Sequence, residues 1–166
     1  MENSLKLTKS VEDYLKIIYH LQKHKGVIQV KDIACELKVK PPSVVEALKK
    51  LSEKGFISHE KYGDIELNEK GSKVAESIIH KHEVLKNFLR ILGVDTETAS
   101  KDACAMEHVL DSKTVDKLKR FSDFTQVCPG NIIDSFNYYK KHGKLPKTKK
   151  NPNLSSKKML NHYEYF

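Results

Sequence analysis

The sequence lacks the features of membrane proteins, exported proteins and disulfide-stabilised proteins. None of its apolar runs approaches the roughly 20 residues needed to cross a bilayer, and Met1–Ser4 lack the basic and apolar regions of a signal peptide. The three cysteines, Cys35, Cys104 and Cys128, are few, odd in number and far apart, which argues against a disulfide framework. We therefore expect a soluble, cytoplasmic protein with no membrane partner and with at least one free thiol.

The net charge of +8 is distributed unevenly along the 166 residues. Residues 140–166 contain eight Lys/Arg and one Asp/Glu, so this segment carries most of the excess positive charge. Residues 1–75 contain 14 basic and 11 acidic side chains, a mild excess that permits nucleic-acid binding without proving it. From residue 144 onward, prolines and clustered lysines give a composition that buries a core poorly, which predicts a flexible basic tail at 144–166.

The first 70 residues predict the order helix, helix, helix, hairpin. Apolar side chains recur at helical spacing between Thr8 and Gly26, and the pair Pro41–Pro42 suits the first turn of a helix, where a missing N–H is tolerated. Two short alternating segments joined by a glycine-containing turn indicate the hairpin. The predicted elements are helices at 8–26, around 33–37 and at 41–54, and strands at 56–60 and 65–67. This order is typical of a winged helix-turn-helix domain.

The chain after the hairpin is predicted to be helical. Three helical patterns follow one another, at 69–92, at about 101–121 and at about 132–142. Gly93 suits the end of the first pattern, and a turn at Cys128–Gly130 precedes the last. No internal repeat is visible. We therefore predict a mainly α fold with one small β-hairpin wing.

The third predicted helix combines an apolar face with a polar face. Val44 and Leu48 lie on the first face, whereas Ser43, Glu46 and Lys50 share the second. A winged helix places this helix in the major groove and its wing near phosphates, so we expect the polar face to contact bases and nearby lysines to contact phosphates. The residues predicted to contact DNA are Lys40, Pro42, Ser43, Glu46, Lys49, Lys50 and Lys61. The alternative is a protein-binding or scaffolding module whose lysines are ordinary surface charges.

Cys104, Glu107 and His108 offer three kinds of metal ligand at helical spacing. Positions i, i+3 and i+4 lie on one face of a helix, so a thiol, a carboxylate and an imidazole converge there. His82, on the preceding long helix, supplies a fourth ligand if the two helices pack antiparallel. Taken singly, a helical His is more often a surface residue and a Cys a small core residue, which is the role that we expect for Cys35.

With both patterns in view, the chain resembles the diphtheria toxin repressor and manganese transport regulator family from about Thr8 to Phe121. The resemblance rests on the segments SVEDYLKIIY at 10–19, PSVV at 42–45, HEVL at 82–85 and DACAMEHVL at 102–110. It implies a winged helix-turn-helix domain followed by an α-helical metal-binding and dimerisation domain. The metal ligands that it implies are Asp13, His82, Cys104, Glu107 and His108.

Departures from the family pattern bear on the choice of metal. The iron-responsive branch has Met where this chain has Asp13 but shares Cys104, whereas the manganese branch shares the aspartate and has Glu in place of the cysteine. Lys16 stands where the manganese branch has a further metal-bridging carboxylate, and Lys86 and Ser100 stand where the iron branch has ancillary ligands. A thiolate with imidazole and carboxylates suits Fe(II), Zn(II) or Co(II), and carboxylate sites suit Mn(II). We expect Fe(II) first and Mn(II) next.

These features predict a metal-dependent transcriptional repressor of metal-uptake genes, not an enzyme. The resemblance implies a homodimer that binds a palindromic operator in double-stranded DNA. Asp13 belongs to the predicted DNA-binding domain, residues 1–70, and the other implied ligands belong to the predicted metal-binding and dimerisation domain, residues 71–143. One shared ion would join the two domains and select the separation at which both DNA-binding helices of a dimer fit the duplex.

Two other functions stay open at the level of sequence. The first is a metal-independent winged-helix regulator in which Cys104, Glu107 and His108 pack or face water. The second is a metallohydrolase, because three protein ligands and an open position can activate water, although no clear general base lies outside the ligand set. We expect Cys128 to be a buried or unused thiol, with a ligand or redox role as the alternative.

Overall fold

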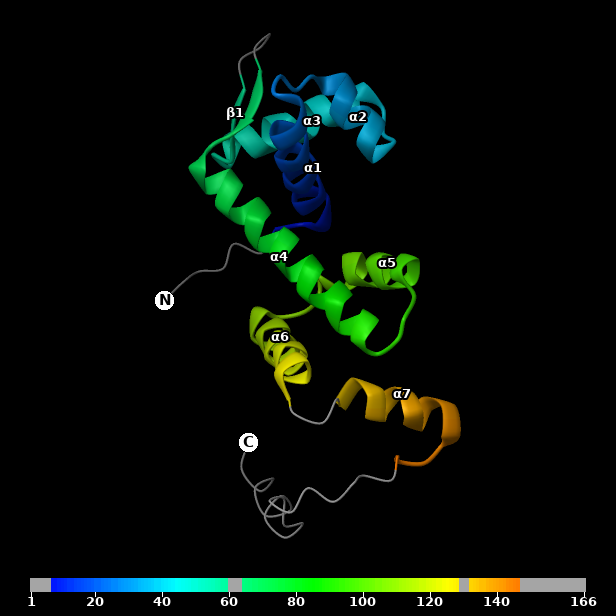
Figure 1. Ribbon diagram of the computed structural model, residues 1–166. Helices are drawn as coiled ribbons and strands as arrows, with labels where there is room; N and C mark the ends of the chain where they lie inside the picture. Colours follow the sequence, from blue (N-terminus) through cyan, green and yellow to red (C-terminus); the bar gives the residue numbers. More distant parts are fainter. Residues whose placement is uncertain (1–6, 60–63, 129–131, 147–166) are drawn as a thin grey trace. The chain divides into compact units, whose positions relative to one another are not determined.

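The computed structural model describes residues 7–59, 64–128 and 132–146, and in these residues three helices precede one small hairpin along the chain and four follow it (Figure 1). The elements are α1 (Lys9–Lys25), α2 (Val30–Leu37), α3 (Pro41–Glu53), β1 (Ile57–His59), β2 (Ile65–Leu67), α4 (Glu69–Ile91), α5 (Thr96–Met106), α6 (Ser112–Val127) and α7 (Ile132–His142). The chain divides into two compact units, residues 1–124 and residues 125–166. Within the described residues, no helix combines the length and the apolar character needed to cross a bilayer.

The three N-terminal helices and the hairpin enclose one hydrophobic core, as the sequence predicts. Leu15 and Ile18 of α1 are fully buried, and Val44 and Leu48 of α3 pack into the same cluster. Burying side chains of this size contributes about 1.5–3 kcal/mol each. The strands pair antiparallel, and Ile57 lies opposite Leu67 with both side chains turned into the core. The predicted winged helix-turn-helix domain is confirmed.

Helix α4 belongs to two hydrophobic clusters. Ala75 and Ile78 in its first half complete the winged-helix core, whereas Val84 and Leu85 in its second half pack against α5 and α6. Its first turn lies so close to the hairpin that a Cβ on Gly71 would stand 2.0 Å from the Phe56 carbonyl oxygen. One continuous helix therefore connects the DNA-binding fold to the helices that follow (Figure 1).

The single helix predicted at 101–121 is wrong, because two helices occupy this region. Helix α5 starts after Asp95, whose carboxylate accepts hydrogen bonds from the backbone N–H groups of Glu97 and Thr98, and it ends at Met106. Helix α6 starts after Asp111, whose side chain accepts a hydrogen bond from the backbone of Lys113 at 2.8 Å. Aspartate is a strong N-cap residue, so Asp95 starts a helix several residues before the predicted start at 101, and Asp111 starts a second helix inside the predicted range.

The prediction for Cys35 is wrong, whereas the prediction for the last helix is confirmed. Cys35 is exposed rather than part of the core, because Ile33 and Ala34 form the buried face of α2 and the thiol lies on the opposite side. The predicted helix at 132–142 is confirmed as α7, which lies in the second unit. The predicted turn at Pro129–Gly130 and the tail from 147 onward lie outside the described residues.

Candidate metal centre

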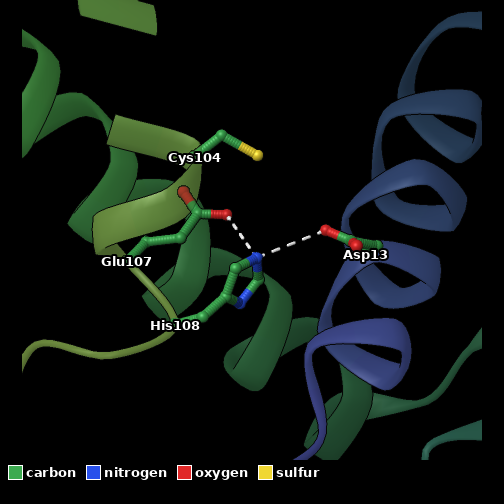
Figure 2. Close-up of side chains that lie close together, drawn as sticks. All are labelled: Asp13, Cys104, Glu107 and His108. Atoms are coloured by element: carbon green, nitrogen blue, oxygen red, sulfur yellow. Dashed lines mark ion pairs between the residues drawn. The ribbon is translucent and has the colours of Figure 1, made fainter. Parts of the chain in front are cut away.

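Four side chains from three segments converge at the C-terminal end of α5. Asp13 comes from α1, Cys104 from α5, and Glu107 and His108 from the turn that directly follows it. Each residue offers one ligand atom, and the four atoms lie within 4.8 Å of one another. Figure 2 shows Asp13 approaching from one side while the other three side chains face it from the other.

The His108 ring occupies the middle of this cluster. Its Nε2 lies 3.5 Å from Asp13 Oδ1 and 3.6 Å from Glu107 Oε1 (Figure 2). His108 Nε2 is buried, and it has no hydrogen-bond partner among the residues that the structure describes. Metal–ligand bonds of about 2.0–2.3 Å place neighbouring ligand atoms roughly 3–3.8 Å apart, so these separations fit a shared cation. The orphaned nitrogen and the donor types together fit a divalent transition metal.

The other nitrogen of the His108 ring contacts α1. His108 Nδ1 and the Glu12 carboxylate form a short hydrogen bond, and both side chains are largely buried. A carboxylate accepts the ring proton at Nδ1, so Nε2 keeps its lone pair toward the cluster, which is the usual way that proteins orient a metal-binding histidine. Sequence reasoning missed Glu12, and the signal for it is its place directly before Asp13 on the same helix.

Glu107 is the most completely buried member of the cluster, with a side chain that is 0% exposed. Lys16 Nζ donates to its Oε1 at 2.5 Å, and His82 Nδ1 lies 2.8 Å from its Oε2. Burial alone would raise the pKa of Glu107, but hydrogen bonds from His82 and Lys16 and the charge of Lys16 outweigh burial and lower this pKa below its ordinary value. The carboxylate is therefore held ionised, and His82 Nδ1 acts as its donor.

His82 thus lies beside the four-residue cluster and contacts it through Glu107. The approach of α4 to the end of α5 brings the two residues together, in line with the helix packing expected from the sequence. Lys16 also contacts Glu107, but its ammonium group cannot ligate a cation. The structure therefore brings Asp13, Cys104, Glu107 and His108 within reach of one ion and places His82 next to them.

The residues predicted to contact DNA lie on the exposed side of α3 and at its start. Pro42, Ser43, Glu46, Lys49 and Lys50 are exposed, as is Lys40 at the N-cap, whereas Lys61 lies outside the described residues. Glu46 and Lys50 form an ion pair of 2.8 Å that lowers the pKa of Glu46. Val45, which is not among the residues predicted to contact DNA, is also 55% exposed on this helix.

Comparison with known proteins agrees with this geometry. The family model described as "Iron dependent repressor, N-terminal DNA binding domain" matches residues 6–65. The model described as "Iron dependent repressor, metal binding and dimerisation domain" matches residues 68–132. The chain is 40% identical to the HTH-type transcriptional regulator MntR of Bacillus subtilis over 111 residues, which are 67% of this chain and 78% of that protein. It is 39% identical to MntR of Lysinibacillus sphaericus over 124 residues, 75% and 87% of the two chains.

Solved structures of metal-dependent regulators also resemble this chain. The manganese regulator SloR superposes with a TM-score of 0.63 at 33% identity, and the metal-dependent transcriptional regulator MtsR with a TM-score of 0.65 at 31% identity. Each match covers 74% of this chain and 58% of the other chain. Fold and site define a metal-dependent, DNA-binding regulator of transcription. The chain belongs to the iron-dependent repressor family.

Proposed function

We propose that this protein is a homodimeric repressor of metal-uptake genes that binds its operator when a divalent transition metal joins Asp13 to Cys104, Glu107 and His108. The observation that carries the proposal is the convergence of an α1 carboxylate with three donors at the end of α5, all within 4.8 Å. The ion supplies a cross-link between the DNA-binding domain, proposed as residues 1–70, and the metal-binding and dimerisation domain, proposed as residues 71–143.

The proposed roles of the residues follow from their contacts. Cys104 binds as a thiolate, His108 through Nε2 and the two carboxylates through oxygen. Glu12 orients the His108 ring, and His82 supports Glu107. We keep His82 as a further candidate ligand, acting through the Nε2 that its contact with Glu107 leaves available.

We propose Fe(II) as the physiological ion. A thiolate combined with imidazole and two carboxylates suits borderline ions, of which Zn(II) and Co(II) are further candidates. Mn(II) is the second candidate, supported by the description of SloR as a manganese regulator and of another similar structure, at a TM-score of 0.63, as a manganese-dependent repressor. Asp13 and Glu107 supply the hard oxygen donors that Mn(II) prefers.

We further propose that the two α3 helices of a dimer bind the half-sites of a palindromic operator. Ser43, Glu46 and Lys50 would contact base edges, Lys40, Lys49 and Lys61 would bind phosphates, and Pro42 would also lie at the DNA surface. Both half-sites are engaged only when the helices stand about one duplex turn, roughly 34 Å, apart. The metal would favour that separation by joining the domains, because a ligand shifts a population toward the state that it binds better.

We infer a binding role rather than a catalytic one, since the four donors are used to connect two domains. We also propose that the protein acts in the cytoplasm, because a regulator of this kind works where the DNA lies. The two alternatives predict other results in the following experiment: a metal-independent regulator binds DNA equally well with a chelator, and a metallohydrolase selects no duplex.

The test begins with protein purified anaerobically and stripped of metal. Duplexes that bind are selected from random DNA in the presence of Fe(II), and their affinity is measured with Fe(II), Mn(II), Zn(II), Co(II) and a chelator. The proposal predicts a palindromic consensus and binding that the chelator abolishes. Asp13→Ala should lose the metal-dependent part of binding, whereas Asp116→Ala, an exposed position on α6, should keep it. Equal binding with chelator would support the metal-independent regulator instead.

A further inference from the structure

Lys16 is a cation of this chain that lies directly at the candidate metal centre. Its Nζ is 2.5 Å from Glu107 Oε1, and its side chain is only 16% exposed. On α1, Lys16 follows Glu12 by four positions and Asp13 by three, so the three side chains share one side of the helix. One face of α1 therefore presents two carboxylates and one ammonium group to the end of α5.

The ion pair gives a buried carboxylate a permanent counter-ion. Glu107 has a fully buried side chain, and an ionised carboxylate out of water is costly unless a cation or several hydrogen bonds compensate it. Lys16 occupies Oε1 and His82 occupies Oε2, so both oxygens already have donors. Glu107 is held in place before any metal arrives.

The charges at the site, and above all the position of the ammonium group, bear on how many ions it can hold. Glu12, Asp13 and Glu107 are carboxylates, and Cys104 adds a negative charge when it binds as a thiolate. One divalent ion supplies two positive charges and Lys16 supplies a third. Glu107 Oε1 faces both Lys16 Nζ and His108 Nε2, so the first ion already shares this oxygen with the ammonium group. A second divalent ion on the same oxygen would have to displace the ammonium, and like charges at contact distance repel strongly where water is scarce.

We propose that Lys16 is a tethered cation that occupies one oxygen of Glu107 and limits each subunit to a single divalent ion at this centre. The same contact links α1 to the end of α5 in the metal-free protein, so part of the connection between the domains does not depend on metal. The inference rests on the proposed function, because it concerns regulation of the same site. Lys16 acts through Glu107 and is a positioning residue, not a ligand.

The first experiment counts metal ions. Metal-stripped protein is titrated with Mn(II), and the bound ions per subunit are counted by native mass spectrometry and by metal analysis after gel filtration. The wild-type chain should bind one ion. Lys16→Glu removes the ammonium and adds a carboxylate beside Glu107, so this variant should bind two ions. Lys9→Glu, the same charge reversal at an exposed position of α1, should remain at one.

The second experiment measures thermal stability, first without metal and then with Mn(II). Lys16→Gln removes the charge but keeps a hydrogen-bonding side chain, so the metal-free variant should melt at a lower temperature than the wild type. The increase in Tm on adding Mn(II) should then be larger in Lys16→Gln than in the wild type, because the ion replaces a lost counter-ion. Lys9→Gln should match the wild type in both measurements.

The outcomes separate this inference from the proposed function. Two ions in the wild-type chain, or one ion in a folded Lys16→Glu variant, would overturn the role of Lys16 while leaving metal-dependent DNA binding intact. If Lys16→Glu does not fold, an unchanged Tm in metal-free Lys16→Gln overturns the role by itself. A chain that binds DNA equally with and without metal would instead contradict the proposed function.

Discussion

Glu12 binds the Nδ1 nitrogen of His108 and thereby leaves the Nε2 nitrogen of the same ring facing Asp13 and Glu107. Glu12 and Asp13, which are consecutive on α1, thus lie next to the two different nitrogens of the His108 ring. Glu12 orients the ring and accepts the proton at Nδ1, and the Asp13 carboxylate lies beside Nε2, where a metal ion would bind. This relationship is the reason why the orphaned Nε2 is best explained as a ligand atom.

Replacing Glu12 tests this orienting role. In Glu12→Gln the shape of the side chain is kept but its charge is lost, so the ring loses its charged acceptor and its preference for Nδ1 protonation. We expect the affinity for Mn(II) to fall roughly 10- to 100-fold, the range found for partners of metal ligands, while the fold persists. Isothermal titration calorimetry measures the change. Glu97→Gln, an exposed position on α5, is the control, and an unchanged Kd in Glu12→Gln would contradict the assignment.

Cys104 is expected to control metal preference. Cys104→Glu replaces a soft thiolate with a hard carboxylate, so affinity for Mn(II) should rise relative to Fe(II) and Zn(II). The Co(II)-loaded wild-type chain should show near-ultraviolet thiolate-to-cobalt absorption, and this band should vanish in Cys104→Glu. Cys35→Ser, at an exposed site on α2, should retain it. A band that survives in Cys104→Glu would mean that the thiol does not bind the ion.

The lowered pKa of Glu107 predicts how the metal-free protein responds to acid. A carboxyl group whose pKa is lower in the folded state stabilises that state above its unfolded pKa, near 4.3 for glutamate, and this stabilisation is lost as pH falls through the folded-state pKa. The urea midpoint should therefore decline below about pH 4.3. Glu107→Gln should flatten that decline, whereas Glu97→Gln should follow the wild-type curve. Parallel curves for Glu107→Gln and wild type would show that the buried contacts contribute nothing.

Gly71 is required by the close approach of α4 to the hairpin. A Cβ at this position would stand 2.0 Å from a backbone oxygen, that of Phe56, which cannot rotate away. Gly71→Ala should therefore lower the free energy of unfolding by about 1–3 kcal/mol, the usual cost of overpacking, despite the higher helix propensity of alanine. Urea denaturation of metal-free protein measures this, with Ser72→Ala as the neighbouring control. A stabilised Gly71→Ala variant would contradict the close approach.

The sequence predicts those parts of the molecule that depend on local periodicity. The order of helices and hairpin follows from apolar spacing and from Pro41, and the proximity of Cys104, Glu107 and His108 follows from helical geometry even though α5 ends at Met106. The break at Asp111 was missed because a cap signal competed with an apolar pattern that continues on both sides. At Asp111 the preference of aspartate for the N-cap position, and not the apolar pattern, indicates the correct helix boundary.

The long-range contacts of the site could not be derived in this way. That Asp13 lies beside His108 follows from packing between α1 and the end of α5, and only the resemblance to a known family indicated it beforehand. The pairing of Lys16 with Glu107 had no local signal, and that of Glu12 with His108 had only the place of Glu12 beside Asp13, because charged residues on a helix are usually solvated. Their roles become visible once the buried partners across the interface are known.

The most direct test of the central claim is an anomalous difference map from crystals of the full chain grown with Mn(II) or, anaerobically, with Fe(II). We predict one strong peak per subunit at this site, within bonding distance of Asp13 Oδ1, Cys104 Sγ, Glu107 and His108 Nε2. A metal peak that lies elsewhere, or one that contacts the end of α5 without Asp13, would contradict the claim that a single ion joins the two domains.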